Sequence, residues 1–441
     1  MQFPVMTQGS KRRLAALAAM QLACFSAHAA GEMQRIEELE KKLAQSMVLI
    51  DQLSARLNQV ESGKSAVVTG EVSEQIGQQA ERLDRIEKSV NRAAENSAKL
   101  GDLGIPLHGF ADVGYSHSSR PLSGNKGGFT LGNLDLYVTP QIGDRVRSIV
   151  ELVFEYGPGN IGVATDLERL QFGYTFSDAA TLWAGRFHTP YGFWNTAFHH
   201  GQQIQTAASR PRFIEFEDKG GILPAHAVGL LASGSVRAGP GRLQYDAYLA
   251  NGNRILDGVL DFNAFKDDNG NKLVGGNLRY SFGGALEGLT LGAHGFTQRV
   301  GEYDKDNTLL GLSKVSMTGL FAVIDRNDWE VIGEYYRFRN KDLLGGSGTH
   351  ASWAGFAQAG YNVTDHWTPY MRYEKAVLDQ GDNYFAAQES GRSYARAVLG
   401  LRYNLNANSA VKLEFDRVRQ TQKDASTAQA NEAKLQFAVR F

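Results

Sequence analysis

The chain has 441 residues, 42% hydrophobic and 21% charged, with a formal net charge of −1 at neutral pH. Because a nearly neutral chain lacks the basic excess that binding to nucleic acid needs, no nucleic-acid partner is predicted. Glycine is abundant at 49 residues and proline is scarce at 10, which is typical of many strands joined by turns. No run of 18 apolar residues follows the N-terminal region, which argues against a helical membrane protein.

Residues 1–29 have the three parts of a secretory signal peptide. Basic residues at positions 11–13 precede an apolar stretch at 14–25, and a small-x-small site ends at Ala29. The only cysteine, Cys24, lies inside this segment, so the mature chain is predicted to have no disulfide and no Cys-based cofactor site. Two alternatives are a lipoprotein signal ending at Cys24 and a short buried helix.

Residues 30–100 carry a heptad repeat that predicts a helical coiled coil in the periplasm. The apolar positions are Ile36, Leu39, Leu43, Ile50, Leu53, Leu57 and Val60, and the pattern resumes at Ile76, Leu83, Ile86 and Val90. Such a narrow stripe cannot bury itself within one helix, which predicts a homo-oligomer. The alternative is a lone amphipathic helix that lies on the rest of the protein or spaces it from the cell wall.

Residues 101–441 are predicted to form the membrane domain. From Leu107 onward the hydrophobic period is two, as in residues 166–176, where Leu170 and Phe172 alternate with polar or small side chains. Connections alternate between short and long, as in an outer-membrane barrel with short periplasmic turns. The short ones are residues 139–143, 177–179, 238–241, 325–328, 362–366 and 404–409; longer ones include residues 118–127, 188–225, 252–272, 340–350 and 378–391. We therefore predict an all-β fold, a transmembrane antiparallel β-barrel of about 16 strands, preceded by the helical coiled coil.

The last segment, residues 434–441, sets Leu435, Phe437 and Val439 against polar or small neighbours and ends at Phe441. A final strand with an aromatic terminus resembles the signal by which the outer-membrane assembly machinery recognises its substrates. We therefore expect that machinery and outer-membrane lipid to be partners, and a location in the Gram-negative outer membrane.

The layout of signal peptide, coiled coil, some 16 strands, long fifth connection and terminal Phe resembles trimeric porins with an N-terminal periplasmic coiled coil. The barrel, with the local sequence GRFHTPYG at residues 185–192, resembles the phosphate-selective porin O and P family. The resemblance implies a trimer and passive transport of small hydrophilic solutes. The chain lacks the lysine- and arginine-rich run of a phosphate channel, so phosphate selectivity is not implied.

The fifth connection, residues 188–225, resembles the porin loop that folds into the lumen and narrows it. The alternatives place it across the outer mouth or at a subunit contact. Its predicted pore-lining residues are His199, His200, Arg210, Arg212 and Lys219, with Arg147, Arg169 and Arg186 on neighbouring strands. These cations predict a bias toward anions unless the strand arginines pair with carboxylates such as Glu151.

Signals for other chemistry are absent from the sequence. His199 and His200 are adjacent and have no zinc-like spacing to a third ligand, so no metal is predicted, and no cofactor either. No G-x-S-x-G or C-x-x-C-H motif occurs, which predicts no enzyme and no attached haem. The alternative function is a barrel sheath around a multihaem cytochrome, which would need a wide lumen without an inward loop.

Overall fold

The computed structural model describes residues 107–119, 127–142, 144–155, 164–215, 221–261, 267 and 270–441. The predicted signal peptide and coiled coil lie outside the described residues and stay predictions. The chain divides into two compact units, Met1–Leu107 with Val138–Asp144, and His108–Tyr137 with Arg145–Phe441, and the second unit is the barrel. Among the described residues, no helix is long and apolar enough to cross a membrane.

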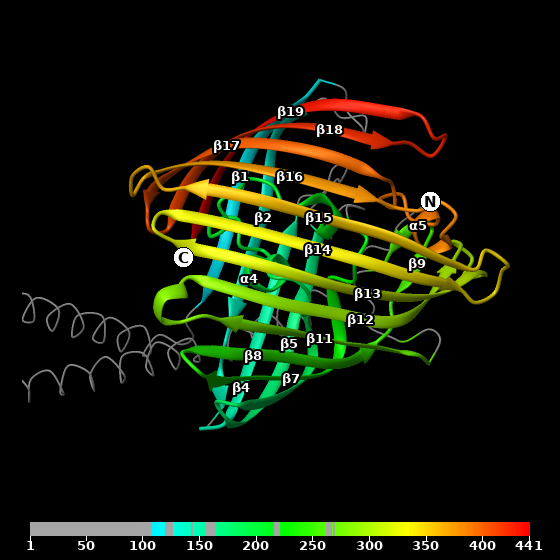
Figure 1. Cartoon of the computed structure of the whole chain (residues 1–441), viewed down its shortest axis with the longest axis horizontal. Helices are drawn as coiled ribbons and strands as arrows, with labels where there is room; N and C mark the ends of the chain where they lie inside the picture. Colours follow the sequence, from blue (N-terminus) through cyan, green and yellow to red (C-terminus); the bar gives the residue numbers. More distant parts are fainter. Residues whose placement is uncertain are drawn as a thin grey trace, which may run out of the picture. The chain divides into compact units, whose positions relative to one another are not determined.

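Sixteen strands, counted over the described residues, form the barrel wall, each antiparallel to the next, which confirms the predicted all-β antiparallel barrel and its strand number. They are β1 (His108–Ser118), β2 (Gly127–Val138), β4 (Val146–Glu155), β5 (Ala164–Ser177), β6 (Ala180–His188), β7 (His226–Ala238), β8 (Gly241–Asn251), β11 (Lys272–Ser281), β12 (Leu289–Tyr303), β13 (Leu309–Arg326), β14 (Trp329–Asp342), β15 (Thr349–Tyr361), β16 (Trp367–Val377), β17 (Tyr394–Asn406), β18 (Ser409–Thr421) and β19 (Thr427–Arg440). The first strand pairs with the last and closes the wall. Figure 1 shows β11 to β18 as tilted neighbours in chain order.

The shorter elements are the strands β3 (Gln141–Ile142), β9 (Arg254–Leu256) and β10 (Val259–Leu260), the helices α4 (Trp194–Ala197) and α5 (Asn383–Ala386), and the 3-10 turns η1 (Arg212–Ile214) and η2 (Gly284–Leu286). The strands β9 and β10 form a small hairpin within the connection between β8 and β11. Helix α4 and turn η1 belong to the connection between β6 and β7.

Connections alternate between short and long, as the sequence predicts. Two residues join β13 to β14, and both Asn327 and Asp328 have positive φ, at 51° and 66°, which suits a tight hairpin turn. On the other rim, β6 and β7 are separated by residues 189–225, which we call the long loop. Both ends of the barrel lie on the short-turn rim, where the backbones of Gly109 and Phe441 exchange hydrogen bonds of 2.9 and 3.0 Å.

The barrel wall is apolar outside, and its charged side chains face inward, unlike those of a soluble protein. In β16, exposed and buried residues alternate strictly along all eleven positions. The exposed Met371 has 60% of its surface accessible, whereas its neighbour Arg372 has 2% and Glu374 has none. Leu399 on β17 is likewise 62% exposed. The charged register therefore faces the lumen, as the alternation predicts.

Candidate functional site

The long loop turns into the lumen and crosses it. Trp194, in helix α4, has no accessible surface, and its backbone N–H donates to Oε1 of Glu334 on β14 at 2.7 Å. The side-chain amide of Asn277 on β11 donates to the carbonyl oxygen of Gly192 at 2.8 Å. Of these two wall strands, β14 lies far from β6 and β7 in the barrel order, so the described part of the loop spans the interior.

Aromatic side chains fill the lumen on one side of the loop, which we call the packed side. Phe213 of η1 meets Tyr336 of β14 edge-on, with ring centroids 4.9 Å apart. Trp194 meets Phe356 of β15 in the same way at 5.7 Å. All four side chains are buried, so this side is a hydrophobic core and conducts no water.

Gly192 allows the close approach to this wall. Its φ is +60°, and a Cβ atom at this position would overlap the carboxylate of Glu334 and the hydroxyl of Tyr336. That hydroxyl donates to Oε2 of Glu334 at 2.5 Å. Glycine at this position thus allows both the left-handed backbone conformation and the close contact with β14.

Buried ionic groups on β16, β17 and β18 hold the second half of the loop, and we call them the polar clamp. Their members are Arg372, Glu374, Arg396, Lys412, Glu414 and Asp416. Arg372 donates to the carbonyl and hydroxyl oxygens of Ser209 at 2.9 and 2.8 Å. The N–H of Arg212 donates to Glu374 at 2.7 Å, and Lys412 donates to the carbonyl oxygen of Ala207 at 3.1 Å. These charge-assisted bonds fix the loop against the wall.

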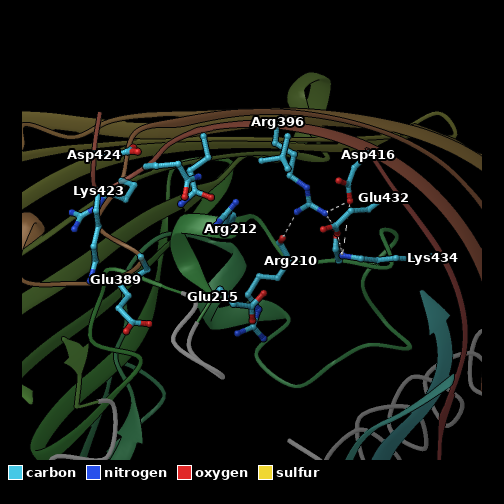
Figure 2. Close-up of a pocket in the computed structure, with 16 residues that line it drawn as sticks. Arg210, Arg212, Glu215, Glu389, Arg396, Asp416, Lys423, Asp424, Glu432 and Lys434 are labelled. Atoms are coloured by element: carbon cyan, nitrogen blue, oxygen red, sulfur yellow. Dashed lines mark hydrogen bonds and ion pairs between the residues drawn. The ribbon is translucent and has the colours of Figure 1, made fainter. Parts of the chain in front are cut away.

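Two cavities lie on the other side of the loop, and we call the space that they form the passage. One cavity of about 870 Å³ opens among the loop, β17, β18, β19 and the outer connections. A second cavity of about 250 Å³ reaches β1 and β2. Both are lined by Ser209, Arg210, Glu215 and Lys434, so the two cavities are neighbours. Figure 2 shows Arg396 and Lys434 of the wall near Arg210 and Glu215 of the loop.

The larger cavity carries both signs of charge. Its basic residues are Arg210, Arg212, Arg392, Arg396, Lys423 and Lys434, and its acidic residues are Glu215, Glu389, Asp416, Asp424 and Glu432. Arg396 donates to Asp416 at 2.6 Å, and Lys434 lies 3.5 Å from Glu432. Because these pairs compensate each other, the larger cavity has only a small excess of positive charge.

Two groups outside the strands show how the outer end of this cavity is charged. The backbone N–H and hydroxyl of Ser426 donate to Oδ1 of Asp424 at 2.9 and 2.5 Å, and these bonds lower the pKa of Asp424. Burial lowers the pKa of Arg392, but an arginine remains protonated at neutral pH. Both side chains therefore carry their charge under ordinary conditions.

The predicted site residues do not come together in one place. Arg210 and Arg212 line the larger cavity. Arg169 forms an ion pair with Glu151, which is the pairing that the sequence left open, and Arg147 is exposed near the short-turn end of β4. Lys219 lies outside the described residues.

Arg186, His199 and His200 are buried. The Nε of Arg186 donates to the carbonyl oxygen of Glu168 at 3.0 Å, and its cross-strand partner is Leu170, which is exposed on the outer face. The sequence did not single out Arg396, Asp416 or Lys434 as contacts of the loop. The alternation along the strands predicts that these side chains point inward, but it does not predict the path of the loop that contacts them.

No protein-family model and no curated protein matches the chain. Among solved structures, it is similar to outer-membrane expressed OmpT of Vibrio cholerae, at 12% identity and a TM-score of 0.51 over 76% of this chain and 97% of that one. The trimer form of in-vitro folded OmpT gives 11% identity and a TM-score of 0.51 over 76% and 98%.

The outer-membrane channel DcaP of Acinetobacter baumannii gives 11% identity and a TM-score of 0.50 over 76% of this chain and 96% of that one. At such identities the likeness establishes the fold, a closed 16-stranded barrel of the kind found in outer-membrane proteins. It does not distinguish the porin O and P family from other barrels.

Proposed function

We propose that the chain is a channel of the Gram-negative outer membrane through which small hydrophilic solutes diffuse passively along the passage. The observation that carries this proposal is the reversed polarity of the wall, with Met371 and Leu399 exposed outside and charged residues buried inside. Hydrophobic strand faces of this kind fit lipid. The two neighbouring cavities beside the loop form the polar route through the interior that we propose for these solutes.

The aromatic side chains at the short-turn rim support a membrane location. Trp329 lies beside Tyr361, and Trp367 lies beside Tyr403, with ring centroids 4.9 and 4.5 Å apart. Both tryptophans are nearly half exposed. Trp and Tyr prefer the boundary between lipid and water, so these pairs fit a girdle at the periplasmic interface.

Selectivity should be weak, with a slight preference for anions. Of the predicted cations, Arg210 and Arg212 lie where a solute would pass, whereas Arg169 is neutralised by Glu151. The surrounding carboxylates offset most of the remaining positive charge. The cytochrome sheath is less well supported because that function needs an open lumen, and the long loop occupies it. We propose no enzymatic role.

Planar-bilayer recording of purified, folded protein tests the channel function. We expect discrete conductance steps and a reversal potential in a salt gradient that indicates a small preference for anions. Protein that inserts into the bilayer, as shown by protease protection, but produces no steps would refute the proposal.

We also propose a trimer, held by the coiled coil of residues 30–100, and the trimer form of OmpT gives a precedent for this barrel type. Removal of residues 31–100 should convert the trimer to monomers in native mass measurements. If the truncated protein stays fully trimeric, the barrel walls make the contact and the helix is a spacer.

A further inference from the structure

Four side chains that could bind a metal ion converge where the long loop leaves the wall, and we call them the His–Glu cluster. They are Glu168, His188, His199 and His226, and their ligand atoms all lie within 4.8 Å of one another. His188 ends β6 and His226 begins β7, and the two are direct cross-strand partners. His199 comes from the loop itself, so the cluster joins both ends of the loop to one of its inner residues.

A β-bulge supplies the carboxylate. In the pairing of β4 with β5, Glu151 faces Arg169 and Leu152 faces Leu167, so Glu168 is the extra residue. A bulge re-aims side chains that would otherwise alternate. Glu168 would share the outer face of Leu170 in a regular strand, but here it turns inward, and it is only 2% exposed.

The spacing of the ligand atoms suits one metal ion. Nε2 of His199 lies 2.9 Å from Nε2 of His226 and 3.7 Å from Oε2 of Glu168. Zinc–nitrogen bonds of about 2.0–2.1 Å place the ligand atoms of a tetrahedral site roughly 3.3 Å apart. Small rotations of the rings would therefore bring these atoms onto one sphere. His226 already contacts the same carboxylate oxygen, and Nε2 of His200 lies 3.3 Å from it.

A neighbouring amide fixes the ring of His199 for binding. Asn195 donates its side-chain N–H to the carbonyl oxygen of Thr189 at 2.9 Å, which sets the orientation of the amide. Its Oδ1 then lies 3.2 Å from Nδ1 of His199. Because an amide oxygen can only accept, Nδ1 carries the proton and Nε2 presents its lone pair to the cluster. This arrangement is the outer-shell support that metal-binding histidines have.

We propose that the His–Glu cluster binds one divalent transition-metal ion, with Zn²⁺ as the best match to three imidazoles and one carboxylate. Four protein ligands leave no open position, so the ion would be structural. It would tie the two ends of the long loop to the wall and fix the loop beside the passage. This site does not depend on the channel function, because it is defined by side chains on β5, β6, β7 and the loop.

Metal binding can be measured directly on full-length protein folded in detergent, purified without a polyhistidine tag and treated with EDTA. We expect calorimetry with Zn²⁺ to show one ion per chain, and Co²⁺ to give the visible absorption of a four-coordinate site. The double variant His199→Gln/His226→Gln should weaken binding by at least about 100-fold. His350→Gln removes a histidine that pairs with Asp379 elsewhere, so it should bind as the unmodified protein does.

A second variant keeps the test decisive if the double variant fails to fold. Asn195→Ala leaves all four ligands in place, and loss of an outer-shell partner should weaken Zn²⁺ binding by about 10–100-fold. Absence of stoichiometric Zn²⁺ and Co²⁺ binding in folded, unmodified protein would overturn the proposal, as would equal binding by the double variant. Metal binding by a protein that gives no conductance would leave the site intact and refute only the channel.

Discussion

The two sides of the long loop face the same barrel wall but differ in what they do with the lumen: one side closes it, and the other leaves it open. On the packed side, Trp194 and Phe213 lie against β14 and β15, and the lumen is closed by a dry aromatic core. Along the passage, Arg210 and Glu215 face polar wall residues, and the space between them can hold water. A 16-stranded barrel is wide enough to need such a division. In the proposed channel, the loop would narrow the pore by filling one side of the lumen.

The polar clamp lies between these two sides and should decide where the loop rests. Burial of so many charges is costly unless each has partners. Here Glu374 accepts from Arg372 at 2.8 Å and from the backbone of the loop. The clamp is therefore the place where a single change should disturb the division most.

The largest effect is expected from Arg372→Ala. This change leaves Glu374 with fewer partners and removes the bonds to Ser209, so we expect the docked loop to lose about 3–5 kcal/mol and the single-channel conductance to rise. Lys305→Ala, in the exposed connection between β12 and β13, should stay within about 0.5 kcal/mol of the unmodified protein. If Arg372→Ala gives a channel no wider than before, the aromatic core alone holds the loop.

A smaller effect should follow from Gly192→Ala, which disturbs the packing of the loop on the packed side. The change strains a residue with φ of +60° and drives a methyl group into Glu334 and Tyr336. We expect a loss of about 1–3 kcal/mol in urea unfolding. Gly270→Ala is a matched control because its φ is +70° and no atom lies within 4 Å of the added Cβ. Equal losses for the two variants would mean that the contact with β14 contributes nothing.

How well the sequence predicts the structure of each part depends on how regular that part is. The alternation along β16 and β17 predicts the strands and the inward register, because period two is a property of any strand with two different faces. It predicts Arg372 and Arg396 inside and Met371 outside, as found. The alternating connection lengths predict the two rims for the same reason.

The site was less predictable because loops have no period. The sequence placed the strand arginines Arg169 and Arg186 opposite the loop, whereas the polar clamp comes from β16 to β18. The sequence did not predict the His–Glu cluster, for a related reason. Glu168 lies on a bulge that breaks the alternation, and His226 stands 27 residues from His199, so no local spacing relates them.

Replacing a charge along the passage should affect conduction less than replacing a residue of the polar clamp. Lys434 lines both cavities, and Lys434→Gln should move the reversal potential toward cations. A unit charge at about 4 Å in water contributes about 1 kcal/mol, or about fivefold for each ion, and it favours an anion while it opposes a cation. The permeability ratio should therefore change by at most about 25-fold. Lys305→Gln alters an exposed residue between β12 and β13 and should change nothing. Equal shifts would indicate that total charge, and not position, sets selectivity.

The smallest effect concerns the outer end of the passage and its dependence on pH. Asp424 is ionised, and the bonds from Ser426 lower its pKa, so the carboxylate keeps its charge as the pH falls to its ordinary value of about 3.9. Asp424→Asn should therefore shift the reversal potential slightly toward anions, and by the same amount at pH 7 and pH 5. Ser426→Ala removes the hydroxyl bond and raises that pKa toward its ordinary value. The Ser426→Ala channel should then lose cation permeability at a higher pH than the unmodified one, near pH 4. If both channels respond to acid identically, the charge of Asp424 does not act on the passing ion, and the residues farther inside, where Arg210 faces Lys434 and Glu215, set the selectivity alone.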